Sequence, residues 1–144
     1  MGLITDRLID LGGTAIIGET IEWLGAEHLL QKRARSNEVK TKISNAVDFQ
    51  RNFAKSKEID LLGNNPGHQN IQAGLSTIEE KSIGNVAKSG SKKIENVIDW
   101  GDQTKKKGMY LMHAPAYAPE SLSGFSSASC QMILFSTGVG NSFN

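Results

Sequence analysis

Short apolar runs that alternate with amphipathic segments are the feature of this sequence that most constrains its fold. The runs over residues 14–18, 109–112 and 131–136 each predict a short buried strand. Residues 94–100 fit a strand or a helix equally well. Strands separated by helices predict an α/β layered fold, in which helices flank a mainly parallel sheet.

The helices are predicted from three- and four-residue apolar spacing and from capping residues. We expect them over residues 3–11, 26–35, 36–55, 77–89 and 119–129. The apolar faces of the first and third carry Leu3, Ile4, Leu8, Leu11, and Val39, Ile43, Ala46, Val47, Phe53, Ala54. The fourth is expected to bury Ile78, Ile83, Val86 and Ala87. Ser36 is a suitable N-cap, and either Ser76 with Glu79 or Thr77 with Glu80 forms a capping box. Residues 58–73, rich in Asn, Gly and Gln, predict a long loop.

Length and charge narrow the class of protein. A chain of 144 residues has room for one compact domain, and its apolar share of 38% fits a globular protein. The formal net charge of +1 provides no field that would attract nucleic acid or a membrane surface. Residues 1–6 lack the basic start and apolar stretch of a signal peptide, so a cytoplasmic setting is expected.

The sparse cysteine and histidine content limits metal chemistry. Cys130 has no second cysteine to pair with, and it is either a buried, inert thiol or a nucleophile. His28, His68 and His113 lie far apart in the sequence and make no ligand-spaced cluster, so no metal site is expected in this chain. The basic run Lys105–Lys107 is typical of a solvated turn.

Ligands of open α/β sheets bind beyond the carboxyl ends of the strands. Three segments meet that description: Gly18–Thr20 with the following residues 25–28, His113–Pro115, and Thr137–Gly140. The last is either a tight structural turn or a nest of backbone N–H groups for an anion. It lacks the third glycine and the helix of a dinucleotide fingerprint, so the fold is Rossmann-like without that site. Lys81 is either solvated or a cation facing a substrate carboxylate.

Four blocks of the sequence, in order, resemble the C-terminal region of the altronate/galactarate dehydratase family. They are Gly12-Gly13-Thr14 with Glu19 and Gly25–Leu30; Asn65-Pro66 through Asn70 with Gly74–Gly84; Ala114-Pro115 with Glu120–Gly124; and Leu134–Gly140. The blocks are similar to the family's GGT…E…GAEHLL, NPSPGN with GGLTTIEEKSLG, TP…ES-x-TG and FTTGRG patterns. Departures occur at Gly67-His68-Gln69, Ala73, His113 and Val139; the last replaces an arginine suited to binding a carboxylate.

The resemblance implies a lyase that removes water from a hydroxylated sugar acid to give a 2-keto-3-deoxy acid, with a divalent metal, typically iron. A base takes the proton α to the carboxylate while an acid or the metal helps the β-hydroxyl leave. A relative in the family, sulfolactate sulfo-lyase, expels sulfite instead and gives the alternative reaction. A third reading is a non-catalytic α/β module that binds a small anion or is purely structural.

The site residues expected from the resemblance fall into two groups. Glu19 or His28 is the candidate base, and the substrate carboxylate is expected at Asn70, Gly74, Lys81, Thr137, Gly138 and Gly140. Residues 1–144 correspond to most of the family's C-terminal region, so the N-terminal, central and extreme C-terminal parts are expected to come in cis or in trans. The chain alone is then expected to be inactive, to bind no iron by itself, and to form a homodimer through exposed apolar faces.

Overall fold

The computed structural model describes residues 1–59, 67–72 and 74–137. The elements in chain order are α1 (Gly2–Asp10), β1 (Thr14–Ile17), the 3-10 helix η1 (Thr20–Trp23), α2 (Glu27–Lys32), α3 (Asn37–Ser56), α5 (His68–Gln72), α6 (Ile78–Lys88), β2 (Ile94–Ile98), β3 (Gly108–Met112) and α7 (Ala118–Ser127). The expected α/β class is confirmed, and residues 94–98 are a strand.

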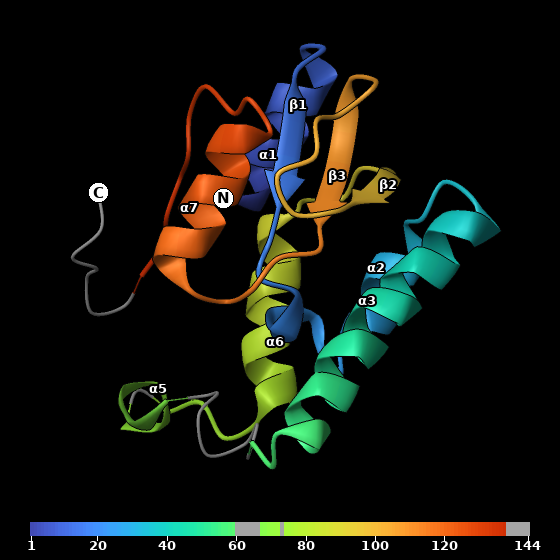
Figure 1. Ribbon diagram of the computed structural model, residues 1–144. Helices are drawn as coiled ribbons and strands as arrows, with labels where there is room; N and C mark the ends of the chain where they lie inside the picture. The colour runs from blue at the N-terminus through green and yellow to red at the C-terminus, as the bar shows by residue number, and fades with distance from the viewer. Residues whose placement is uncertain (60–66, 73, 138–144) are drawn as a thin grey trace.

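The sheet is wholly parallel and has β3 at its centre. Its order is β1-β3-β2, with Thr14 opposite Gly108 and Ile98 opposite Met112. Because the three strands run the same way, the residues that follow β1 and β3 emerge at one edge of the sheet. Figure 1 shows α6 beyond that edge, below the arrowheads of β1 and β3.

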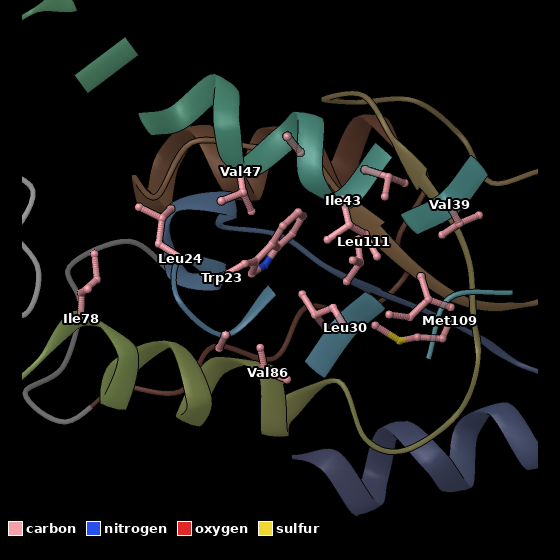
Figure 2. Packing of buried hydrophobic residues seen from close by; sticks show 14 residues of the cluster. Trp23, Leu24, Leu30, Val39, Ile43, Val47, Ile78, Val86, Met109 and Leu111 are labelled. Carbon is pink, nitrogen blue, oxygen red and sulfur yellow. The ribbon is translucent and has the colours of Figure 1, made fainter. Parts of the chain in front are cut away.

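Side-chain alternation along β3 divides the core between two faces of the sheet. Met109 and Leu111 join the larger cluster, which η1, α2, α3 and α6 complete. Tyr110 and Met112 join a smaller cluster against α7. In Figure 2, Trp23 lies in the middle of the larger cluster, between α3 and α6. The sheet is therefore covered by helices on both faces.

Two capping predictions can be compared with the structure. The Ser36 hydroxyl accepts a hydrogen bond from the Val39 backbone N–H at 3.3 Å, so α3 begins where expected. Of the two alternatives for α6, Thr77 is the N-cap, and its hydroxyl accepts from the Glu80 N–H at 3.2 Å. The Glu80 carboxylate turns back to the Ser76 N–H at 2.8 Å. This reciprocal bonding fixes the start of α6.

Three expectations are wrong in part. Residues 131–136 form no strand, because their apolar side chains face outward and the segment pairs with none of β1, β2 and β3. The expected loop over 58–73 contains a short helix, α5, within its described part. Apolar spacing also misjudged two helices, because Phe53 of α3 and both Ile83 and Ala87 of α6 are exposed. The apolar face of α1, from Leu3 to Leu11, is exposed as well. Apolar spacing identifies a helix, but it does not show which side chains of that helix become buried.

Candidate functional site

A cleft of about 1400 Å³ runs along the whole length of β1 and past its carboxyl end. Its polar part is lined by Glu19, Glu22, Lys81, Asn85 and Lys88. Its apolar part is lined by side chains of α1 and of the segment after α7, Ile4, Leu8 and Met132–Phe135 among them. Glu19, Glu22, Lys81 and Lys88 are thus four of the charged residues that line the cleft.

The backbone of Glu19 is held in an unusual conformation. Its φ of 62° and ψ of 63° lie in the left-handed region, which costs a non-glycine residue free energy. The next residue fixes it, since the Thr20 N–H donates to the Ala114 carbonyl and the Ala114 N–H donates to the Thr20 hydroxyl, both at 3.0 Å. These bonds tie the end of β1 to the end of β3. Such strain is typical of functional sites whose surroundings determine the backbone.

Burial is the main reason that the Glu19 carboxyl group differs from a surface glutamate. It raises the pKa of Glu19 from 4.5 to about 7, and the neighbouring charge of Glu22 adds to the rise. The charges of Lys88 and Lys81 act in the opposite direction without cancelling it. A carboxyl group with a pKa near 7 exchanges a proton readily at neutral pH, which suits a general acid or base.

Glu22 connects η1 to α6. One of its carboxylate oxygens, Oε1, accepts from the Lys81 ammonium at 2.8 Å, and both side chains are mostly buried. Lys81, Asn85 and Lys88 follow at four- and three-residue spacing, so one face of α6 presents all three. Asn85 is 4% exposed, and its Nδ2 has no acceptor among the described residues. A buried amide without an acceptor is costly.

His113 supports this edge of the sheet from outside the cleft. Its Nδ1 lies 3.1 Å from the Thr20 hydroxyl, and its ring meets Phe49 edge-on at a centroid distance of 5.1 Å. Burial lowers the pKa of His113, while the charge of Asp99 acts to raise it. The imidazole is therefore neutral at pH 7, and it holds the Thr20 hydroxyl in place.

The Gly25–His28 segment serves a structural purpose. Gly25 has a φ of 79°, and a Cβ atom there would collide with the side chain of Glu79 on α6. The following Glu27 pairs with Arg51 of α3 at 2.5 Å. His28 is exposed on α2 and does not line the cleft. The two candidate bases, Glu19 and His28, are thus not brought together.

The predicted carboxylate-binding residues are placed as follows. Lys81, Asn70 and Thr137 line the cleft, whereas the exposed Gly74 does not. Asn70 lies on α5 and accepts from the Gly67 N–H at 3.2 Å through its side chain. Gly138 and Gly140 lie outside the described residues. The roles of all these residues stay predictions.

Cys130 also lines the cleft, half-buried, and burial raises the pKa of its thiol. A raised pKa disfavours the thiolate, so the inert reading of this cysteine is the better one.

Sequence reasoning missed Glu22, Asn85 and Lys88. Helical spacing offered a signal for the last two, because they lie four and seven residues after Lys81. The position of Glu22 three residues after Glu19 offered a weaker signal.

Among the described residues, no three His, Cys, Asp or Glu side chains are grouped so as to hold a metal ion. None of the helices in the described ranges is long and apolar enough to cross a membrane.

Comparison with known proteins gives a family over the whole chain. Residues 1–144 match the family described as D-galactarate/altronate dehydratase, C-terminal. The chain is 36% identical over 144 residues to altronate dehydratase of Bacillus subtilis, and 33% identical to altronate dehydratase of Escherichia coli; both alignments cover 99% of this chain and 29% of the relative. It is 31% identical over 143 residues to the (2R)-sulfolactate sulfo-lyase subunit beta of Chromohalobacter salexigens, covering 98% of this chain and 37% of that subunit. The chain therefore spans between 29% and 37% of the length of these relatives.

Proposed function

Because the chain belongs to the D-galactarate/altronate dehydratase family, we propose that it is the domain of a sugar-acid dehydratase that supplies the acid–base carboxyl group. The observation that carries the proposal is Glu19, a buried carboxyl group with a pKa of about 7, placed at a strand end beside two lysines. The substrate is an altronate- or galactarate-like acid and the product a 2-keto-3-deoxy acid.

In the proposed reaction the Glu19 carboxylate takes the proton from the carbon α to the substrate carboxylate. The β-hydroxyl then leaves as water with the proton that Glu19 has taken up, which restores the carboxylate. The enol that remains loses its hydroxyl proton and gains one at the β-carbon, which gives the 2-keto-3-deoxy acid. The charge that develops on the substrate during proton removal requires nearby cations. Lys81 and Lys88 line the cleft beside Glu19 and supply that charge.

Lys81 is the proposed partner of the substrate carboxylate. Its ammonium already lies 2.8 Å from Glu22 Oε1 in the mostly buried part of the cleft, which fixes its position before substrate arrives. A preorganised ammonium binds a carboxylate without the ordering cost of a free surface lysine. Asn70 and Thr137 add polar groups along the same cleft.

Iron, which the resemblance implies for full-length members of the family, does not fit the described residues, since they offer no group of three suitable ligands. A bound divalent iron would polarise the leaving hydroxyl. We propose that its ligands come from another part of the enzyme, in cis or in trans. Each step assigned to this chain therefore involves only binding or proton transfer.

A sulfo-lyase activity is the second candidate, and the 31% identity to the sulfolactate sulfo-lyase subunit favours it. Removal of the α proton by Glu19 is common to both reactions, and only the leaving group differs. A non-catalytic anion-binding module is the remaining alternative. It does not account for the strained, proton-exchanging carboxyl group at Glu19.

The test is a product assay for the 2-keto-3-deoxy acid, with ferrous iron, using galactarate and altronate. We expect no turnover by the chain alone, and turnover when it is mixed with the remaining regions of a full-length relative. In the mixture, Glu19→Gln is expected to reduce kcat by about 10²–10⁴-fold, the usual range for a lost general base. The matched control is Glu38→Gln, since Glu38 is an exposed glutamate on α3.

Two results would contradict this assignment. One is turnover by the chain alone that a chelator abolishes, which would place the metal site in this chain. The other is an active mixture whose rate does not change with Glu19→Gln. An assay with sulfolactate in place of the sugar acids distinguishes the second candidate, since sulfite is then released.

A further inference from the structure

His113 is a titratable side chain that the proposed reaction does not use. It follows β3 directly and lies outside the cleft. Its backbone N–H donates to the Ile98 carbonyl at 2.8 Å, which continues the pairing of β3 with β2. Its ring meets Phe49 of α3 edge-on. The imidazole is therefore held by a neighbouring strand and by a helix, with its Nδ1 atom beside Thr20.

The hydroxyl group of Thr20 belongs to a fully buried residue, so a hydrogen bond left unmade there is costly. The hydroxyl oxygen accepts from the Ala114 backbone N–H at 3.0 Å. The hydroxyl proton also needs an acceptor, and His113 Nδ1 lies 3.1 Å from the oxygen. Nδ1 accepts a proton donor only in the neutral imidazole that carries its own proton on Nε2. The bonding pattern therefore assigns that tautomer to His113.

Glu19 is constrained through both of its neighbours in the chain. On one side, the Trp23 indole N–H donates to the Gly18 carbonyl at 3.2 Å. On the other side, Thr20 is bonded to Ala114 through its backbone N–H and through its hydroxyl. The left-handed conformation between them, with a φ of 62°, is unfavourable for a glutamate. It depends on the bonds that the two neighbours make.

We propose that His113 is a positioning residue for Glu19. By accepting the Thr20 hydroxyl proton, it fixes that hydroxyl in the orientation that receives the Ala114 N–H, and the end of β1 is then unable to relax. The inference rests on the proposed function and deepens it, because it names a residue outside the cleft on which the acid–base carboxyl group depends. Such a residue changes the rate of reaction without touching the substrate, since a small displacement of a catalytic group is enough.

The first measurement needs no variant. Nitrogen NMR spectra of the histidine rings in the wild-type chain at pH 7 report which ring nitrogen carries the proton. We expect His113 to be neutral, with its proton on Nε2, because Nδ1 accepts from Thr20. A proton on Nδ1 would overturn the proposal, since the Thr20 hydroxyl would then receive two donors and have no acceptor.

The second measurement follows the pKa of Glu19 by carbon NMR of its carboxyl group. His113→Leu removes the acceptor and should lower that pKa from about 7 toward 4.5, because the released carboxyl group gains solvent. His113→Asn keeps an acceptor oxygen close to the place of Nδ1 and should retain the wild-type pKa. In a Thr20→Val background, His113→Leu should have no further effect, because the bond between the two residues is already lost.

The control separates positioning from general loss of stability. Val39→Ala removes methyl groups from a buried residue of α3 and destabilises the core. Val39 lies ten residues before Phe49, which is roughly 15 Å along the helix axis. We expect this variant to leave the pKa of Glu19 unchanged.

The third measurement is the rate of the mixture with the remaining regions of a full-length relative. His113→Leu should lower kcat about 10–100-fold, the scale of effect of a misplaced catalytic group. The KM should change little, because the residues that contact the substrate are untouched. His113→Asn should restore most of the rate, which a role of the ring in packing alone would not allow.

The outcomes separate the inference from the proposed function. If folded His113→Leu keeps the wild-type pKa of Glu19, or if His113→Asn lowers it equally, then the inference is overturned and the proposed function stands. If His113→Leu does not fold, an unchanged pKa of Glu19 in Thr20→Val overturns the inference instead. If the pKa values change as expected but Glu19→Gln leaves the rate of the mixture unchanged, then the proposed function is overturned, and the link between His113 and Glu19 stands.

Discussion

The two sides of η1 show how differently one short segment is used. Trp23 is fully buried among apolar side chains under α3, and its indole N–H donates to the Gly18 carbonyl at 3.2 Å. Glu22, its immediate neighbour, points to the opposite side and pairs with Lys81 of α6. The side toward α3 is apolar and densely packed. The side toward the cleft holds paired charges, a strained backbone and a buried amide without an acceptor.

The comparison indicates that the tightly packed side of η1 stabilises the unfavourable features of the cleft side. A left-handed glutamate and two close carboxyl groups are each unfavourable, and they persist only where surrounding structure leaves the chain no alternative. Burial of Trp23 and the bonds between Thr20 and Ala114 supply that constraint. The strained segment at Glu19 does not stabilise itself, so it depends on the packed residues next to it.

The largest expected effect comes from the packed side. Trp23→Ala removes a fully buried ring and its hydrogen bond, and it should lower the free energy of unfolding by about 3–5 kcal/mol. Urea denaturation followed by circular dichroism measures the change. Trp100→Ala is the control, since Trp100 is 49% exposed, and it should cost less than half as much. Equal losses in the free energy of unfolding would contradict the view that the packed side of η1 is the more stabilising one.

On the cleft side, Glu19→Gln should stabilise the chain at pH 8. The folded state raises the pKa of Glu19 from 4.5 to about 7, so folding favours its neutral form. Wild-type stability is then lost as the pH rises from 4.5 through 7, by about 3 kcal/mol. The variant avoids this loss, and the two proteins should be alike at pH 4. Urea denaturation at both pH values decides it, and a variant less stable than wild type at pH 8 would contradict the strained-site interpretation.

The exposed face of α1 predicts self-association, which was also expected from the sequence. Leu3 is 86% and Leu11 76% exposed, and neither lines the cleft. We expect a two-fold dimer through this face, weakened about tenfold by the double change Leu3→Ser and Leu11→Ser, a loss of about 1.4 kcal/mol. Sedimentation equilibrium measures the constant, with Ile83→Ser on α6 as the control. A wild-type chain that stays monomeric at high concentration would argue against this interface.

The smallest expected effect concerns the start of α6. Thr77→Ala removes the N-cap hydroxyl that accepts from the Glu80 N–H, and it should cost about 1 kcal/mol in the free energy of unfolding. Ser76→Ala, which removes only an exposed hydroxyl bonded to the Glu80 carboxylate, should cost less than half of that. Denaturation in urea compares the two. A larger effect for Ser76 would mean that the capping box is built on the other residue.

Local signals were sufficient for most of the elements. The Ser36 cap and the apolar spacing after it predicted α3 to within a residue or two, because the cap marks where the helix begins and the spacing shows how far it continues. The glycine-bounded runs predicted β1 and β3 for a similar reason. The sequence left residues 94–98 ambiguous, and the strand predicted over 131–136 was wrong. A strand forms only where a neighbouring strand offers hydrogen bonds, and the periodicity of a segment does not tell whether such a neighbour exists.

The candidate site divides along the same line. The sequence by itself determined the family likeness, the α/β class, and Glu19 and Lys81 as candidates, because these depend on residue identity and short-range spacing. Only the tertiary structure decided that Glu22 and Lys81 meet, that His28 stands apart, and that burial moves the pKa of Glu19 toward 7. Desolvation and ion pairing depend on which distant segments come together, and this is decided only when the strands and helices pack.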